Sequence, residues 1–247
     1  MDEKPLSKMY HEGSKKITRL FPSDDRTWPE TWKQVEYKVY ERLPKIILPR
    51  ETLSFDLSKA LTTRESKRDF SRLPLSLTEV STLLRYAVGV WKKPGDIEPA
   101  TRRTYPSGGG LYPVEVYLLV RRGTEELPAG LYHYNFNDHS LSVLVTGLFE
   151  QVEKPGFFNY SFADAAPLAL FMTSVFERQY QKYGERSYRF ALLEAGHISH
   201  NVYLVAAALG LHCCAIGGVR GGDTEVEKIL DIDGHYESLI HSMLLGK

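Results

Sequence analysis

The sequence predicts an α+β protein in which helices pack on a central sheet. Its 247 residues suit one large domain, and 43% of them are hydrophobic, which is enough for a sizeable core. Helical and strand-like segments follow one another without the regular alternation of a doubly wound parallel sheet. We therefore expect a main domain over residues 54–247, preceded by an N-terminal extension over residues 1–53.

The extension and the first part of the main domain differ in pattern. The extension holds several prolines, two tryptophans and mixed charge, and Pro29 favours a helix near Pro29–Tyr40. Residues 76–88 predict a helix more strongly, because Ser76 and Glu79 form a capping-box pair ahead of an apolar stripe.

The rest of the domain is predicted from apolar runs and turn residues. Residues 114–121 are expected to form a buried strand, and residues 130–144 a hairpin that turns around Asn137-Asp138. The remaining elements are expected as a strand over 167–175, a long helix over 185–209 ended by Gly210, a short strand from 212 into a glycine turn, a short helix over 223–232 and a final strand over 237–246. The long helix is apolar around much of its circumference, so it is expected in the core or at a dimer interface.

Composition argues against several classes of protein. Basic and acidic residues number 31 each, which argues against a nucleic-acid binder that works by bulk charge. No apolar run approaches the roughly 18 residues of a membrane helix, and the first residues lack an apolar signal core, so we expect no membrane segment and a cytoplasmic location. The two cysteines, Cys213 and Cys214, are adjacent, which excludes a disulfide framework and places them on opposite faces of a strand.

A positive cluster is the first candidate site. Arg64, Ser66, Lys67 and Arg68 stand within five positions at the end of a probable helix. Guanidinium groups and a hydroxyl suit a phosphate, so the cluster is a candidate anion site. The alternative is a solvated charge cluster that includes the neighbouring carboxylates.

A glycine-rich segment is the second candidate. Gly108–Gly110 lie between two Tyr-Pro pairs and let a flat ligand or a phosphate approach the backbone amides. The segment fits neither a Rossmann nor a Walker motif, and a tight turn is the alternative. Gly217 and Gly218 repeat the pattern, and they either close the other side of the same pocket or form a plain strand-end turn.

Two further groups are weaker candidates. Lys182 and Tyr183 are adjacent and can serve as a proton relay if one pKa is shifted, although an ordinary surface pair has the same pattern. Glu194, His197 and His200 share one broad helix face, but no further ligand is apparent, so no metal site is expected.

The order of these motifs is more specific than any one of them. RESKRDF, YPSGGGLYPVEVYLL, GLYHYN, KYGERSYRFALLEAGHISHNVYLVAAALGL and CAIGGV follow one another. This series resembles the nitroreductase superfamily of flavin enzymes, and more narrowly the SagB-type dehydrogenases, which include McbC-like azoline oxidases. The resemblance covers residue 54 to residue 247. It implies an FMN-bound homodimer of nitroreductase-like α+β fold, with a mixed, mainly antiparallel sheet flanked by helices and the flavin at the dimer interface.

The resemblance also implies roles for particular residues. Those matched to the flavin are Arg64, Ser66 and Arg68 for the phosphate and ribityl chain, Pro106, Ser107 and Gly108 along the isoalloxazine ring, and Gly217 and Gly218 on its far side. Lys182 and Tyr183 match the pair implicated in catalysis by azole-forming dehydrogenases. A Lys or Tyr beside the ring could take the proton that aromatisation releases, provided its pKa is lowered.

The implied activity is oxidation of thiazoline or oxazoline rings to thiazole or oxazole in peptide-derived natural products. The substrate would be a peptide or carrier-bound azoline supplied by a cyclodehydratase or a nonribosomal peptide synthetase (NRPS), and residues 1–53 are the candidate docking segment. Two alternatives stay open: an NAD(P)H-dependent FMN reductase or nitroreductase, and a non-catalytic partner subunit.

One departure from the family pattern concerns the phosphate. Many nitroreductases carry a basic segment after the last strand, whereas the sequence here ends at LLGK. Arg220, Lys247, Arg102 and Arg103 are the expected substitutes.

Overall fold

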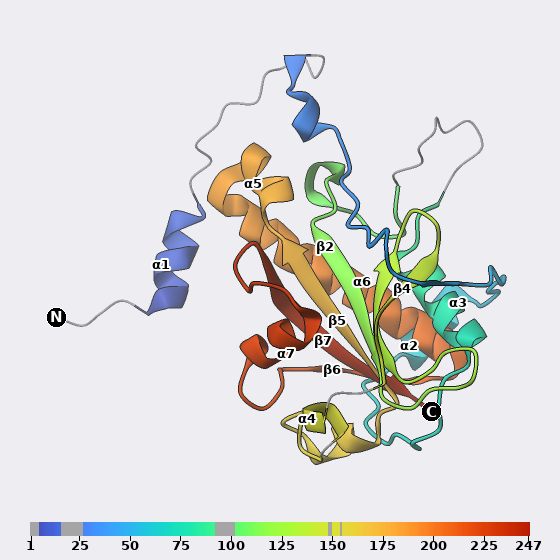
Figure 1. The fold of residues 1–247 in the computed structure, drawn as a ribbon. Coiled ribbons are helices and arrows are strands. Elements are labelled where there is room, and N and C mark those ends of the chain that lie inside the picture. The colour runs from blue at the N-terminus through green and yellow to red at the C-terminus, as the bar shows by residue number, and fades with distance from the viewer. Residues whose placement is uncertain (1–4, 16–26, 92–101, 148–149, 154) are drawn as a thin grey trace.

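The computed structural model describes residues 5–15, 27–91, 102–147, 150–153 and 155–247, and it confirms the α+β class (Figure 1). In the described residues one seven-stranded sheet has the order β1-β4-β3-β2-β5-β7-β6, and every neighbouring pair is antiparallel. Its strands are β1 (Lys45–Ile47), β2 (Val114–Val120), β3 (Gly130–Asn135), β4 (Ser140–Thr146), β5 (Leu168–Val175), β6 (His212–Ile216) and β7 (Glu237–Gly246).

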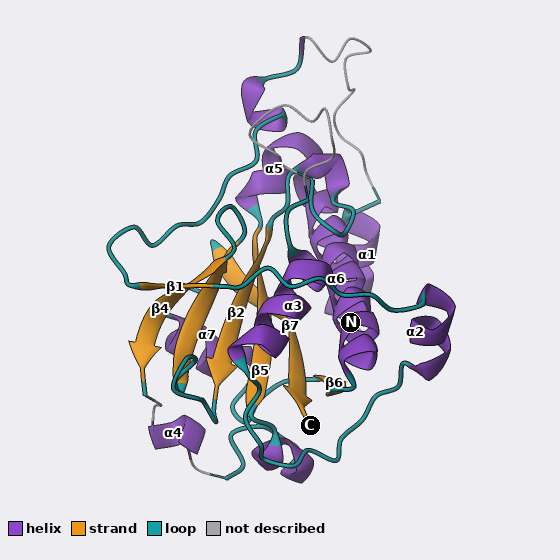
Figure 2. Ribbon diagram, turned by 90° about the vertical axis from the view of Figure 1, so that its right-hand side faces the viewer, coloured by secondary structure: helices purple, strands orange, loops and turns teal. Residues whose placement is uncertain are grey.

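Helices cover both faces of this sheet (Figure 2). They are α1 (Leu6–Gly13), α2 (Leu57–Thr63), α3 (Leu77–Val88), α4 (Glu150–Glu153), α5 (Glu177–Tyr183), α6 (Ser187–Leu209) and α7 (Asp223–Leu230). Short 3-10 turns lie at Glu30–Trp32, Gly108–Gly110, Ser161–Ala165 and Gly184–Arg186. The core between α3, α6 and the sheet is separate from the core that α7 forms with residues 157–166 on the opposite face.

The alternation of β-strand side chains builds these two cores. In β2 the side chains of Val116 and Leu118 face α3 and α6, whereas Tyr117 lies in the core of the opposite face. Cys213 and Cys214 of β6 likewise lie in different cores as free, buried thiols, which confirms their expected placement.

The strongest sequence signals are confirmed. In α3 the Ser76 hydroxyl accepts a hydrogen bond from the Glu79 amide at 3.2 Å, and the Glu79 carboxylate accepts one from the Ser76 amide at 2.7 Å. Helix α6 ends at Gly210, which adopts the left-handed conformation with φ of 69°. The expected hairpin is formed by β3 and β4 around Asn137-Asp138.

The helix expected near Pro29–Tyr40 is wrong. Only Glu30–Trp32 are helical, as a single 3-10 turn, and the chain beyond them has no regular structure before β1. Tertiary contacts hold it there, because the Lys38 ammonium donates to the Tyr117 hydroxyl at 2.7 Å and pairs with Glu237 at 2.5 Å. Such contacts override a local preference for helix.

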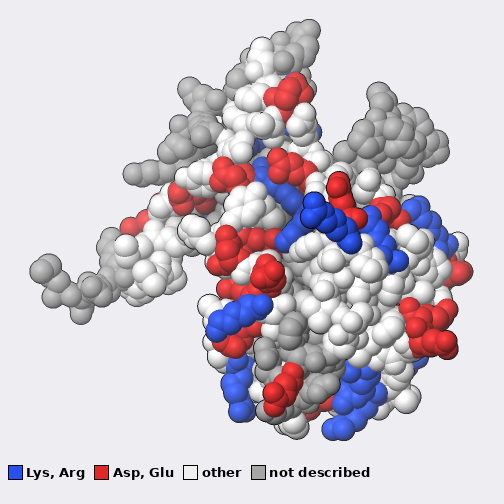
Figure 3. Space-filling view, in the orientation of Figure 1, with Lys and Arg blue, Asp and Glu red and all other residues white. Residues whose placement is uncertain are grey.

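Figure 3 shows positive and negative side chains interspersed over the visible face, in keeping with the balanced composition. None of the helices in the described part of the chain has the length and apolar character needed to cross a membrane.

Candidate active site

The glycine turn at Gly108–Gly110 has a conformation that glycine favours. Gly109 and Gly110 both have positive φ, 70° and 68°, which residues with a Cβ rarely adopt. The turn is held from behind, because the Ser107 hydroxyl accepts a hydrogen bond from the Tyr112 amide at 2.9 Å. The Gln179 side-chain amide, from α5, donates to the Gly108 carbonyl at 3.0 Å. The turn is therefore fixed against α5.

Helix α5 brings the Lys182–Tyr183 pair to this turn. A methyl group at Gly109 would lie 2.6 Å from Oη of Tyr183 and 3.2 Å from Nζ of Lys182. The structure thus unites two motifs that lie more than 70 positions apart in the sequence. The interpretation of an ordinary surface pair is wrong, since only 4% of Lys182 is exposed.

Aromatic rings surround the Lys182 ammonium. The centroid of the Trp28 ring lies 4.2 Å from Nζ, and that of Trp32 lies 5.9 Å away. Burial lowers the pKa of Lys182 below its ordinary value, because the apolar surroundings disfavour the charged form. Burial raises the pKa of Tyr183 for the same reason. Lys182 is accordingly the better proton acceptor of the pair, and Tyr183 stays protonated.

A buried carboxyl group lies behind the same turn, on α6. Glu194 is 1% exposed, and neither of its oxygens has a hydrogen-bond partner among the described residues. Burial raises the pKa of Glu194 to about 7, against smaller opposing effects from Ser107 and Arg103. Glu194 is therefore an acid that can gain or lose a proton near neutral pH, which sequence reasoning missed.

Glu115 of β2 is buried nearby but behaves in the opposite way. Burial opposes its ionisation, yet Arg178 at 2.6 Å and His133 at 2.8 Å outweigh that effect and lower the pKa of Glu115 to about 2. The contrast between Glu194 and Glu115 arises from the presence of close cationic partners rather than from the extent of burial.

The three α6 residues considered as metal ligands, Glu194, His197 and His200, do not converge on one point. Glu194 is buried, whereas His197 and His200 are exposed. In the described residues no group of three His, Cys, Asp or Glu side chains could hold a metal ion.

The positive cluster has a different environment, at the end of α2. The Arg64 guanidinium lies over the Tyr203 ring at 5.5 Å, and that of Arg68 lies over Phe162 at 5.9 Å. The Ser66 hydroxyl lies 3.1 Å from the Tyr203 hydroxyl, so Tyr203 of α6 organises the segment. Among the described residues no carboxylate pairs with Arg64 or Arg68, which leaves their charges for an external anion.

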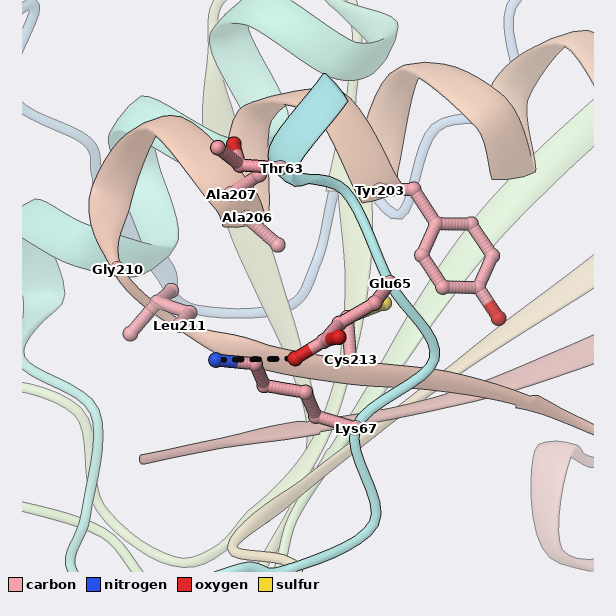
Figure 4. A pocket seen from close by; sticks show the side chains of 9 residues that line it. All are labelled: Thr63, Glu65, Lys67, Tyr203, Ala206, Ala207, Gly210, Leu211 and Cys213. Carbon is pink, nitrogen blue, oxygen red and sulfur yellow. Dashed lines mark ion pairs between the residues drawn. The ribbon is translucent and has the colours of Figure 1, made fainter. Parts of the chain in front are cut away.

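A pocket of about 120 Å³ lies beside this segment (Figure 4). Residues of the α2 end face the C-terminal part of α6 across it, and Tyr203 lines it as well. Lys67 pairs with Glu65 at 3.4 Å within the pocket, so Lys67 is not free in the way that Arg64 and Arg68 are.

The second glycine pair lies on the side of the positive cluster. Gly217 and Gly218 follow β6 directly, and the amide of Ala215 in β6 donates to the Tyr203 hydroxyl at 2.7 Å. The Gly108 turn instead meets Phe190, near the other end of α6. Phe190 and Tyr203 are 13 positions apart in one helix, which corresponds to about 20 Å. One chain therefore forms two separate clusters.

The four cations expected to replace the missing phosphate contact differ in burial and in partners. Lys247 pairs with Glu79 at 2.9 Å, and Arg103 is buried with its guanidinium on the Tyr105 hydroxyl at 2.8 Å. Arg220 and Arg102 are exposed.

Comparisons with known proteins show the family of this chain. The sequence profile of the nitroreductase family matches residues 61–247. Protein MJ1384 of Methanocaldococcus jannaschii, which carries the name of a nitroreductase, is 34% identical over 178 residues, 71% of this chain and 84% of that protein.

Two further relatives have names that refer to peptide processing. The trifolitoxin-processing protein TfxB of Rhizobium leguminosarum bv. trifolii is 29% identical over 211 residues, 83% of this chain and 56% of that protein. The microcin B17-processing protein McbC of Escherichia coli is 32% identical over 170 residues, 62% of this chain and 57% of that protein. The chain thus spans little more than half the length of these two relatives.

Solved structures share the fold. A structure described as a nitroreductase from Anabaena variabilis has a TM-score of 0.72 and 28% identity, over 98% of this chain and 46% of that one. A chain of the E. coli microcin synthetase McbBCD complex, with truncated pro-MccB17 bound, has a TM-score of 0.61 and 23% identity, over 98% of this chain and 91% of that one. With the match over residues 61–247, the chain belongs to the nitroreductase family.

Proposed function

We propose that this protein is an FMN-dependent dehydrogenase that oxidises thiazoline or oxazoline rings to thiazole or oxazole in peptide-derived natural products. The observation that carries the proposal is the burial of Lys182 and the close approach of Lys182 and Tyr183 to the Gly109 backbone. The names of TfxB and McbC, which refer to trifolitoxin and microcin processing, support the peptide-derived class of substrate.

The residues present fit a flavin mononucleotide. Arg64 and Arg68 supply guanidinium groups that pair with no carboxylate of the described residues, and Ser66 supplies a hydroxyl; these groups suit its phosphate. The turn at Pro106, Ser107 and Gly108 offers backbone without bulky side chains for a flat ring, and Gly217 and Gly218 offer the same on the side of the positive cluster.

A homodimer accounts for the separation of these two groups. In this proposal one copy supplies the positive cluster and the other supplies the glycine turn with Lys182. The outer surfaces of α2 and α6 suit such contact, because Leu57 is 65% exposed and Leu193 is 59% exposed. An apolar pocket of about 230 Å³ lies between the same two helices.

The proposed reaction requires a general base from the protein. Aromatisation of an azoline removes a hydride from one ring carbon and a proton from its neighbour, and FMN, when bound, accepts the hydride. The Lys182 amine takes the proton, because burial favours its neutral form. The Tyr183 hydroxyl stays protonated beside it and can donate a hydrogen bond to the substrate.

The partner in this proposal is an enzyme that makes the azoline, either a cyclodehydratase or an NRPS that presents it on a carrier protein. The McbBCD neighbour is a complex with a precursor bound, which supports assembly with such a partner.

The test combines flavin spectroscopy with product analysis. The protein is reconstituted with FMN and mixed anaerobically with a thiazoline-containing peptide, alone and with a cyclodehydratase. We expect the flavin absorption to bleach and the peptide to lose two hydrogens. Lys182→Met serves as the control and should leave the flavin oxidised.

A reductase is the second candidate, and the similarity to MJ1384 favours it. Rapid bleaching by NADPH without any azoline oxidation would replace the first proposal with this one. A colourless protein that binds no FMN would indicate a non-catalytic subunit instead.

A further inference from the structure

The rings that surround Lys182 lie outside the region that the nitroreductase family profile matches. That match begins at residue 61, whereas Trp28 and Trp32 belong to the N-terminal extension. Their rings meet edge to face with centroids 6.2 Å apart, and the Trp28 centroid is 4.2 Å from Nζ of Lys182. Part of the candidate active site is therefore built by a segment added to the family domain.

This segment is attached to the helix that carries Lys182. Thr31, Gln34 and Glu36 share a small pocket with residues of α5. Glu36 also lies 4.0 Å from Arg178, one turn before Lys182 on α5. Farther along, Lys38 pairs with Glu237 at 2.5 Å, which ties the segment to the sheet.

Among the described residues, charged side chains close to this segment pair with one another or with the sheet. Glu30 and Lys33 of the 3-10 turn pair with each other at 3.3 Å, and Arg178 pairs with Glu115. Tyr183 is the titratable side chain that shares the face of Gly109 with Lys182. Within the described part of the chain, the two indole rings, the Tyr183 side chain and the Gly109 backbone lie around the amine.

Aromatic rings act on an amine in two opposing ways. Their faces attract the ammonium form, while their bulk excludes water and disfavours that form. For Lys182 burial lowers the pKa, because exclusion of water disfavours the ammonium form.

We propose that Trp28 and Trp32 are positioning residues of the active site, which enclose the Lys182 amine against Gly109 and Tyr183 and keep it dehydrated. The catalytic consequence rests on the proposed function, in which Lys182 is the base. The enclosure itself is a property of the chain without flavin or substrate.

The enclosure is tested by measuring how fast Lys182 is acetylated as a function of pH. Full-length protein is treated with trace acetic anhydride, and mass spectrometry of the Lys182 peptide gives a midpoint and a plateau rate. We compare the unchanged protein with Trp28→Ala, Trp32→Ala and Trp28→Phe. Trp91→Phe is the matched control, because Trp91 is the third tryptophan and packs on Tyr86 and Arg85 instead.

For Trp28→Ala we expect the midpoint to move upward toward the ordinary lysine value of 10.5 and the plateau rate to rise several-fold. Trp28→Phe keeps a ring and should restore most of the original midpoint, and Trp32→Ala should shift it less, since its ring is farther away. A midpoint and plateau in Trp28→Ala equal to those of Trp91→Phe would overturn the proposal. If Trp28→Ala does not fold, the same comparison is made with Trp32→Ala and Trp28→Phe.

The outcome is separate from that of the proposed function. A shifted midpoint in a protein that never oxidises an azoline would support the enclosure and reject the function. Azoline oxidation together with an unchanged midpoint in Trp28→Ala would support the function and reject the enclosure.

Discussion

The two ends of helix α6 carry two differently built clusters. At its N-terminal end Lys182 is buried, and the Lys182 and Tyr183 side chains lie against the glycine turn. At its C-terminal end Arg64 and Arg68 rest on aromatic rings without a carboxylate partner among the described residues. The first cluster is enclosed, and the second is open.

This difference indicates how each cluster works. An enclosed cluster can shift pKa values, because the surrounding protein replaces water around its titratable groups. An open cluster of guanidinium groups suits an anion that arrives from outside. Changes in the enclosed cluster should therefore alter rates and pH dependence, while changes in the open cluster should alter ligand affinity.

The largest effect is expected from Lys182→Met. In the proposed reaction loss of the general base lowers the rate of azoline oxidation by about 10²–10⁴-fold. FMN affinity should change little, because in this proposal Arg64, Ser66 and Arg68 hold the FMN phosphate, whereas Lys182 takes the substrate proton. Single-turnover flavin bleaching and an FMN titration measure the two quantities. A variant that loses flavin as well as activity would contradict the separation of the two clusters.

Glu194→Gln is expected to change the pH dependence of stability. The raised pKa of Glu194, about 7, means that its stabilising contribution is complete below about pH 4.5 and is lost as the pH rises through 7. Glutamine cannot ionise, so the variant should match the unchanged protein at about pH 4 and exceed its free energy of unfolding by about 3 kcal/mol at about pH 8. Urea denaturation at the two pH values measures this difference.

Glu115→Gln provides the matched control with the opposite sign. The lowered pKa of Glu115, about 2, means that its contribution is complete above about pH 4.5 and is lost as the pH falls. This variant should be less stable than the unchanged protein at pH 8. If the free energies of unfolding of both variants depend on pH in the same way, then Arg178 and His133 do not cause the difference in pKa between Glu115 and Glu194.

The fold class and the motifs could be predicted from the sequence, whereas the contacts between distant motifs could not. Local signals fixed the ends of α3 and α6, because capping residues act over a few positions. The contact of Trp28 with Lys182 joins positions 154 residues apart, and no local pattern encodes it. The pKa of Glu194 likewise depends on what does not lie beside it, which a pattern of residue types cannot show.

Gly109→Ala should be more harmful than Gly110→Ala. Both residues have positive φ, so each alanine carries a strain of about 1 kcal/mol. Only the methyl group at Gly109 would also collide with Tyr183, 2.6 Å away, while the space beside Gly110 is open. We expect a loss of about 2–3 kcal/mol at Gly109 and about 1 kcal/mol at Gly110 in urea denaturation.

A second substitution shows whether Tyr183 causes that difference. In a Tyr183→Phe background, which lacks the colliding oxygen, Gly109→Ala should approach the cost of Gly110→Ala. If Gly109→Ala still costs more stability than Gly110→Ala in this background, the added methyl group collides with an atom other than the Tyr183 oxygen.

The smallest effect is expected in the open cluster. Arg68→Ala removes an exposed side chain, so the free energy of unfolding should stay within about 0.5 kcal/mol of its original value. FMN affinity should fall about tenfold, because a charge-assisted contact with the phosphate is lost. Lys67→Ala is the control, and since Lys67 is already paired with Glu65 its effect on affinity should be smaller. Equal losses of FMN affinity in a fluorescence titration would mean that the cluster attracts the phosphate by its summed charge. If neither variant loses affinity, another cation such as Arg220 binds the phosphate instead.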